Sequence, residues 1–144
     1  MARQTPGLNL NEFLPYRLSI VTNRISAAFA RLYAEKFDLS IPEWRVMAVL
    51  GQQPGLSADE VCSATEMDKV PVSRAVTKLL DKGLLNREFS GTDRRRSILS
   101  LSEAGDGVYA QIVPLALGYE VELKAALTDA EQAQLDVLLA KLGV

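Results

Sequence analysis

The stretch that most constrains the fold is residues 68–101, DKVPVSRAVTKLLDKGLLNREFSGTDRRRSILSL. Its first half carries apolar residues at helical spacing between Asp68, a favoured helix N-cap, and Gly83, a favoured residue just past a helix end. After Gly83 the pattern changes to that of two strands, 84–90 and 96–101, separated by a turn-rich tip that is loaded with arginine. We therefore expect a helix followed by a β-hairpin.

Two shorter helices are expected before this stretch. Residues 40–43 and 57–60 both match the capping box, in which a Ser or Thr side chain caps the helix start and a Glu three residues later caps it in return. The first helix should end in the glycine-containing segment 51–55, and the second should end near Thr65. Helix, short connection, helix and basic hairpin is the order of a winged helix-turn-helix, whose second helix lies in the DNA major groove.

A long helix is expected at residues 11–37. Its apolar residues recur at steps of three and four, a heptad-like period that is typical of a helix packed along another helix. The stripe is formed by Leu14, Leu18, Val21, Ile25, Ala28 and Leu32. A helix of roughly seven turns is longer than a small core can cover, so a partner helix is favoured over an ordinary core-facing role.

The C-terminal part of the chain predicts two further helices. The first begins at Ser102 and contains Pro114 and Gly118, which should kink or interrupt it. Residues 128–131 match a third capping box and open the last helix. The residues expected on the inward face of that helix are Leu135, Leu138, Leu139 and Leu142.

These elements predict a fold that is mainly α with a small β-hairpin wing. We expect a single unit over residues 1–144, with a winged helix-turn-helix at 38–101 and dimerisation helices at 8–37 and 102–144. The two flanking segments hold more apolar surface than one small winged domain can hide, which favours a homodimer.

Positive charge is concentrated in the segment that carries the predicted second helix and hairpin. The whole chain has a net charge of −2, but residues 69–96 hold eight Lys or Arg against three Asp or Glu. Such a segment can present one positive face to nucleic-acid phosphates. No aromatic residue is expected among the exposed basic side chains as a platform for stacking bases, so duplex DNA is favoured over RNA.

The helix and the hairpin would contact DNA in different ways. Residues near the N-terminus of a groove-bound helix reach base edges, and a slim hairpin tip fits the minor groove, where narrow A-tracts attract Arg. A serine at the N-terminus of the preceding helix could hold a phosphate. The candidate DNA-binding residues are Ser57, Lys69, Val70, Pro71, Ser73, Arg74, Lys78, Asp93, Arg94, Arg95 and Arg96.

Several segments resemble the MarR family of transcription regulators. They are residues 42–50, 72–76, 82–87, 92–95 and 100–105, which read PEWRVMAVL, VSRAV, KGLLNR, TDRR and SLSEAG. The resemblance implies a homodimer with intertwined terminal helices, a palindromic operator in duplex DNA, and a recognition helix that reads the major groove. It also implies that Arg95 is the minor-groove arginine of the wing and that Asp93 holds it in position.

Many members of this family bind small aromatic or phenolic anions between the dimer helices and the winged domain. By that resemblance, the candidate ligand-binding residues are Tyr16, Arg17, Ile20, Trp44 and Met47. The alternative for Trp44 and Met47 is ordinary core packing, and Tyr16 could belong to the dimer interface. The expected function is a sequence-specific DNA-binding regulator, either a repressor relieved by a small aromatic ligand or an activator.

Other classes of protein are disfavoured by what the sequence lacks. It has no histidine, one cysteine and neither of the usual glycine-rich nucleotide loops, so we expect no enzyme activity, metal site or cofactor. It has no run of about 18 apolar residues and no signal-peptide pattern, so we expect a cytoplasmic protein without a membrane span. A winged-helix protein-interaction module without DNA specificity stays an alternative, although three consecutive arginines at the hairpin tip argue against it.

Overall fold

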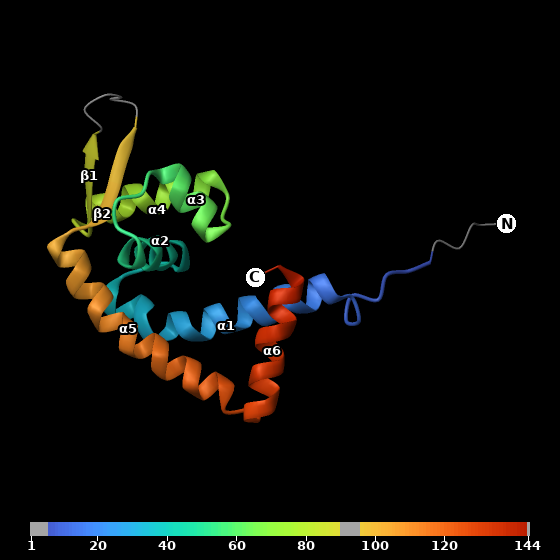
Figure 1. Ribbon diagram of the computed structural model, residues 1–144. Helices are drawn as coiled ribbons and strands as arrows, with labels where there is room; N and C mark the ends of the chain where they lie inside the picture. Colours follow the sequence, from blue (N-terminus) through green and yellow to red (C-terminus); the bar gives the residue numbers. More distant parts are fainter. Residues whose placement is uncertain (1–5, 90–95, 144) are drawn as a thin grey trace. The chain divides into compact units, whose positions relative to one another are not determined.

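The computed structural model describes residues 6–89 and 96–143 (Figure 1). They form two compact units, one that extends to Ile41 and one that begins at Pro42. The first unit contains α1 (Leu14–Phe37). The second contains nearly all of α2 (Ile41–Gln52), and then α3 (Ala58–Thr65), α4 (Lys69–Asp81), β1 (Leu85–Phe89), β2 (Ser97–Leu101), α5 (Glu103–Lys124) and α6 (Asp129–Leu142). Helices with a small two-stranded hairpin confirm the predicted fold class.

α1 begins at Leu14, later than the predicted start near residue 11. Pro15 lies in its first turn, where the missing N–H costs little, and the helix ends at Asp38, which adopts a left-handed conformation with φ of 52°. The members of the predicted heptad stripe that are exposed are Leu14, Leu18, Val21 and Leu32. Large apolar side chains in a row on an exposed helix are typical of a surface that contacts a partner.

The second unit contains the helix pair expected of a helix-turn-helix. The capping box at the start of α3 is confirmed: the hydroxyl of Ser57 accepts from the N–H of Glu60, and the carboxylate of Glu60 accepts from the N–H of Ser57, both at 3.2 Å. α4 ends just before Gly83, whose φ of +72° lies in the left-handed region that glycine adopts without strain. The predicted boundaries of both helices are therefore close to those observed.

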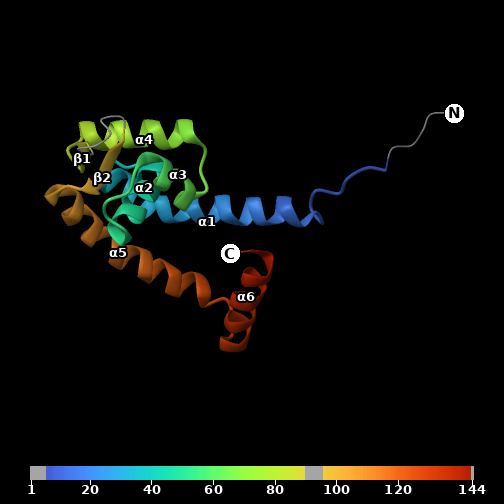
Figure 2. The ribbon, with the colours of Figure 1, turned by 45° about the horizontal axis from the view of Figure 1, so that its top comes forward.

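β1 and β2 form an antiparallel hairpin in which Leu85 faces Leu101. On its other edge β2 joins the segment before α3 through a bridge between Leu56 and Leu99, where the N–H of Leu99 donates to the carbonyl of Leu56 at 2.7 Å. This bridge attaches the hairpin to the start of α3. The hairpin stands beside α3 and α4, and α5 leads away from its base, in both views of the chain (Figures 1 and 2).

The core of the second unit draws on α2, α3, α4, the hairpin and α5. Its buried apolar residues are Val46, Met47, Leu50, Val61, Val72, Ala75, Val76, Leu79, Leu84, Leu85, Leu99, Leu101 and Ile112. Burial of each large apolar side chain contributes about 1.5–3 kcal/mol relative to exposure. Cys62 on α3 is half-buried.

One charged group lies inside this core. Glu43 on α2 is only 2% exposed, and both of its carboxylate oxygens lie 3.2 Å from Nζ of Lys82, which follows α4 directly. A buried carboxylate is tolerated only when cations or donors compensate for its lost hydration. The ion pair therefore joins α2 to the C-terminal end of α4.

α5 is docked onto the hairpin by its first turn. The hydroxyl of Ser102 donates to the carbonyl of Gly83 at 2.6 Å and accepts from the N–H of Gly105 at 3.0 Å. A Cβ at position 105 would collide with the backbone carbonyl of Leu84, so this close approach requires glycine. The helix continues through Pro114 to Lys124 without an interruption.

α6 begins with the predicted capping box, in which Thr128 and Glu131 cap each other. The predicted inward orientation of its leucines is wrong for a single chain. The exposed residues are Leu135, Leu138, Leu139 and Leu142, and α6, which the structure describes in full, has no buried residue. The physical reason is that no neighbouring element of the same unit covers this helix.

Candidate nucleic-acid interface

α4 buries one face and exposes the other along its length. The buried face consists of Val72, Ala75, Val76 and Leu79, so its burial turns the polar residues of the helix toward solvent. The predicted DNA-binding residues of α4 are all exposed: Lys69, Val70, Pro71, Ser73, Arg74 and Lys78. The structure thus gathers these residues on the solvent side of one helix.

The first turn of α4 is only partly capped. Asp68 occupies the predicted N-cap position with extended backbone angles, but its side chain makes no capping hydrogen bond. The N-terminal N–H groups of a helix that lack a side-chain cap can donate to an anion such as a phosphate. Further along, the hydroxyl of Thr77 donates to the carbonyl of Ser73 at 3.0 Å, so that hydroxyl proton is already engaged within the helix.

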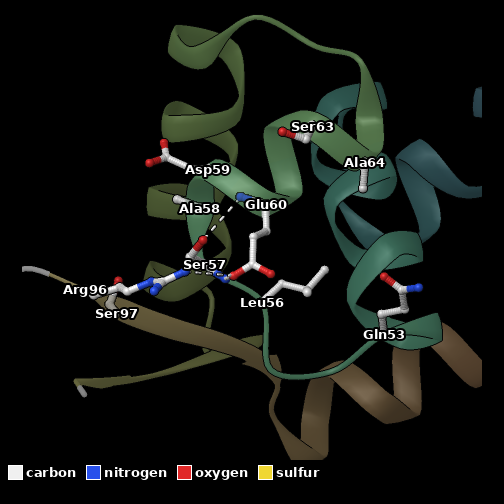
Figure 3. Close-up of a pocket in the computed structure, with 10 residues that line it drawn as sticks. All are labelled: Gln53, Leu56, Ser57, Ala58, Asp59, Glu60, Ser63, Ala64, Arg96 and Ser97. Atoms are coloured by element: carbon white, nitrogen blue, oxygen red, sulfur yellow. Dashed lines mark hydrogen bonds and ion pairs between the residues drawn. The ribbon is translucent and has the colours of Figure 1, made fainter. Parts of the chain in front are cut away.

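Arg96 directly precedes β2 and reaches the start of α3 (Figure 3). Its Nη2 lies 3.7 Å from Oε1 of Glu60, and both side chains are largely exposed. The pKa of Glu60 is lowered mainly by the N–H of Ser57, next by the Ser57 hydroxyl and less by the charge of Arg96, while partial desolvation opposes the shift. Solvent screens an ion pair as exposed as this one and makes it weak, so Arg96 can exchange Glu60 for a phosphate at low cost.

An open pocket of about 860 Å³ lies over this ion pair, between the start of α3 and the start of β2 (Figure 3). It is lined by Gln53, Leu56, Ser57, Ala58, Asp59, Glu60, Ser63, Ala64, Arg96 and Ser97. Its two carboxylates outnumber its one guanidinium, so the pocket is not an anion site in itself. Ser57 is mostly buried, and its hydroxyl already accepts the capping bond from the N–H of Glu60.

The wing tip falls outside the described residues. The predicted DNA-binding residues concerned are Asp93, Arg94 and Arg95. Their roles, including the pairing of Asp93 with Arg95, therefore stay predictions from the sequence.

The five predicted ligand-binding residues lie on two helices. They are Tyr16, Arg17 and Ile20 on α1, and Trp44 and Met47 on α2. These helices belong to separate compact units, so the grouping stays a prediction. Met47 is completely buried, and Trp44 is half-buried and stacks on the ring of Tyr109, with centroids 6.1 Å apart. Both of these contacts fit the core-packing alternative.

Two features of this surface were missed by sequence reasoning. The contact between Glu60 and Arg96 joins residues that are far apart in sequence, and only the pairing of β2 with the segment before α3 brings them together. Phe89, at the end of β1, has an exposed aromatic ring within the basic segment 69–96, where no exposed aromatic was expected. The sequence placed Phe89 in a predicted strand, but it did not show how much of that strand the rest of the fold covers.

Within residues 6–89 and 96–143, no group of three or more His, Cys, Asp or Glu side chains could hold a metal ion. Over the same residues, no helix has the length and apolar character needed to cross a membrane.

Comparison with known proteins agrees with this geometry. Residues 37–96, which include α2, α3, α4 and β1, match the MarR family. Over 114 residues the chain is 31% identical to a protein of Thauera aromatica that is named as a transcriptional regulatory protein for the hcr operon. The match covers 79% of this chain and 69% of that protein, so it extends beyond the winged helix-turn-helix.

Solved structures are similar over almost the whole chain. A MarR/EmrR family transcriptional regulator from Acinetobacter sp. ADP1 has a TM-score of 0.84 and 27% identity, and the match covers 94% of this chain and 95% of that one. BpsR of Bordetella bronchiseptica, whose DNA binding is regulated by 6-hydroxynicotinic acid, has a TM-score of 0.82 with 95% and 97% coverage; at 23% identity that likeness is one of fold. The chain belongs to the MarR family of winged helix-turn-helix transcription regulators, which are DNA-binding proteins and not enzymes.

Proposed function

We propose that this regulator binds a palindromic operator in duplex DNA as a homodimer and represses transcription until a small aromatic ligand releases it. The observation that carries the proposal is the outer face of α4, where Ser73 and Arg74 are exposed one turn into the helix while the opposite face is buried. An exposed helix with polar residues near its N-terminus fits the major groove. Residues 38–101 form the DNA-binding part in this proposal.

The proposed contacts divide into base readout and phosphate binding. Base readout falls to Val70, Pro71, Ser73 and Arg74, because the first turns of a recognition helix reach base edges. The proposed phosphate contacts are Ser57, Lys69, Lys78 and Arg96, which flank these residues in the sequence or lie at the start of α3 and β2. In the wing, Arg95 enters the minor groove with Arg94 beside it, and Asp93 holds Arg95, as the family resemblance implies.

The homodimer is proposed from the apolar faces that the chain leaves exposed. α6 has no buried residue, and large apolar side chains are exposed on α1 and on the second half of α5. A second copy can cover these apolar faces, which assigns residues 8–37 and 102–144 to dimerisation. An obligate interface of this kind buries more than about 2,000 Å². Sedimentation equilibrium at micromolar concentration should find a dimer, and a monomer would refute this part of the proposal.

The aromatic ligand is proposed from the family resemblance and from BpsR, which has the same fold and is regulated by 6-hydroxynicotinic acid. In this chain Arg17 could pair with the carboxylate of such an anion, and Tyr16, Ile20, Trp44 and Met47 supply aromatic and apolar surface. Titration of the DNA complex with hydroxylated benzoates and nicotinates should release the operator. Tight DNA binding that none of these compounds changes would remove the ligand from the proposal.

Selection from a random duplex library tests the DNA-binding proposal. Full-length protein should enrich an inverted repeat whose half-site centres lie about 10 bp apart, one helical turn, because two recognition helices related by a two-fold axis meet successive major grooves. Affinity for the enriched duplex should fall with rising salt as phosphate contacts are displaced. If no sequence is enriched, the protein is at most a non-specific binder, and the protein-interaction module becomes the better account.

A further inference from the structure

Val70 stands out on α4 because it is large, apolar and exposed. Its side chain is 57% exposed, whereas Val72, Val76 and Leu79 of the same helix are buried. A β-branched residue in a helix has a lower propensity than Ala, and a side chain that lies mostly in water gains little burial energy in return. Neither helix propensity nor core packing therefore requires a valine at position 70.

The position of Val70 places it in line with the proposed base-reading side chains. Val70, Ser73, Arg74 and Thr77 are spaced at i, i+3, i+4 and i+7, so they share one stripe of α4. Val70 lies at the N-terminal end of this stripe, in the turn that a groove-bound helix brings nearest to base edges. It is followed by Pro71, which has no N–H to donate. The N-terminal end of the stripe therefore offers an apolar contact where a hydrogen-bonding contact would be expected.

We infer that Val70 is a specificity-determining residue that contacts the C5-methyl group of a thymine in the major groove. The inference rests on the proposed function and adds to it the base that one residue recognises. The thymine methyl is the apolar group that base pairs present in the major groove, and apolar side chains are its usual partners. An isopropyl group cannot satisfy the donors and acceptors of the other base edges, so it favours a thymine over cytosine at that position.

The spacing on α4 also limits where this thymine lies. Val70 and Arg74 are four residues apart, which is about 6 Å along the helix axis. Base pairs are stacked about 3.4 Å apart. The thymine contacted by Val70 should therefore lie within about two base pairs of the base that Arg74 contacts, once in each half-site of the inverted repeat.

Replacement of thymine by deoxyuridine tests this contact, because it removes only the methyl group and keeps the base pair. The probe is a duplex that the full-length wild-type protein has enriched from the random library, with each thymine replaced in turn. At one position per half-site, the loss of the methyl should weaken binding about fourfold, as expected for one buried methyl group. Replacement in both half-sites should weaken it about fifteenfold.

Variants at position 70 show whether this residue is the one that senses the methyl. Val70→Ala should bind the thymine duplex and the deoxyuridine duplex with nearly equal affinity. The effect of the methyl group would then depend on the residue at position 70, and a general loss of stability cannot produce such a coupling. Val70→Ile, which keeps a branched apolar side chain, should retain the discrimination. Thermal unfolding of each variant checks that the fold is intact.

Three results would overturn the inference. The first is that deoxyuridine at no position changes the affinity of the wild type for the enriched duplex, while the protein still strongly prefers this duplex to random DNA. The proposed function would then stand without this contact. Another is a Val70→Ala variant that still discriminates as the wild type does, which would assign the thymine to a different residue. A failure to enrich any duplex would remove both the inference and the proposed function.

Discussion

Removal of the ammonium group that faces Glu43 is the sharpest test of how α4 is held in place. Both carboxylate oxygens of Glu43 lie 3.2 Å from Nζ of Lys82. Lys82→Met keeps most of the length and the apolar stem of the side chain but removes this cation from the buried carboxylate. Loss of one partner of a buried ion pair costs about 3–5 kcal/mol. Because the Lys82 side chain is 28% exposed and so partly solvated, we expect the lower end, about 3 kcal/mol.

Equilibrium unfolding in urea measures this loss, and thermal unfolding provides a second readout. For a chain of this size, about 3 kcal/mol corresponds to a lowering of the melting temperature by roughly 10 °C. Glu43→Gln combined with Lys82→Met should recover part of the stability, since the buried negative charge is gone. If the free energy of unfolding of Lys82→Met lies within about 0.5 kcal/mol of the wild-type value, the ion pair does not hold α2 against the end of α4 and the reasoning fails.

Three further predictions follow from other parts of the chain. Arg95→Ala should weaken DNA binding and reduce the slope of log affinity against log salt concentration by about one unit. Lys124→Ala, in the acidic C-terminal part, should change neither. Equal affinities of the two variants for DNA would exclude the wing assignment. Gly105→Ala should lower the free energy of unfolding in urea by about 1–3 kcal/mol, because its Cβ would meet the backbone carbonyl of Leu84. Gly107→Ala, with open space around it, should instead raise the free energy of unfolding by about 0.5–1 kcal/mol. Similar results for the two variants would contradict the close approach at Gly105. The N–H of Thr128, and next its hydroxyl, lower the pKa of Glu131, so the stability that this carboxylate contributes is present above its unfolded pKa and is lost as the pH falls. Glu131→Gln should therefore lose less stability than the wild type between about pH 6 and about pH 3. Identical pH profiles for the two proteins would contradict this.

The local parts of the fold were predictable because their signals are short-range. The capping boxes at Ser57 and Thr128, the left-handed Gly83 and the change of period after it each depend on residues within a few positions of one another. Those signals were sufficient to place α3, α4 and the hairpin within a residue or two. They also identified the exposed side of α4, because its buried face follows directly from helical spacing.

Features that depend on distant contacts were not predictable in the same way. The leucines of α6 have the spacing of a core-facing helix, but spacing cannot tell whether the covering surface belongs to the same chain or to a second one. The burial of Glu43 beside Lys82 and the reach of Arg96 to Glu60 join residues that only the tertiary fold brings together. The expected interruption of α5 at Pro114 is absent, since the helix runs from Glu103 to Lys124, whereas a kink at this proline stays a prediction.

Binding to single-base variants of the enriched operator, for the wild type and Arg74→Ala, tests most directly the claim that α4 reads DNA sequence. Wild-type affinity should fall by about 1–3 kcal/mol for a change at the base pair that Arg74 contacts. Arg74→Ala should lose a similar amount on the intact operator, lose its preference at that base pair alone, and bind random DNA almost as well as before. If Arg74→Ala loses affinity equally on every sequence, Arg74 is a phosphate contact; if the wild type prefers no sequence at all, the account of this protein as a sequence-specific regulator is contradicted.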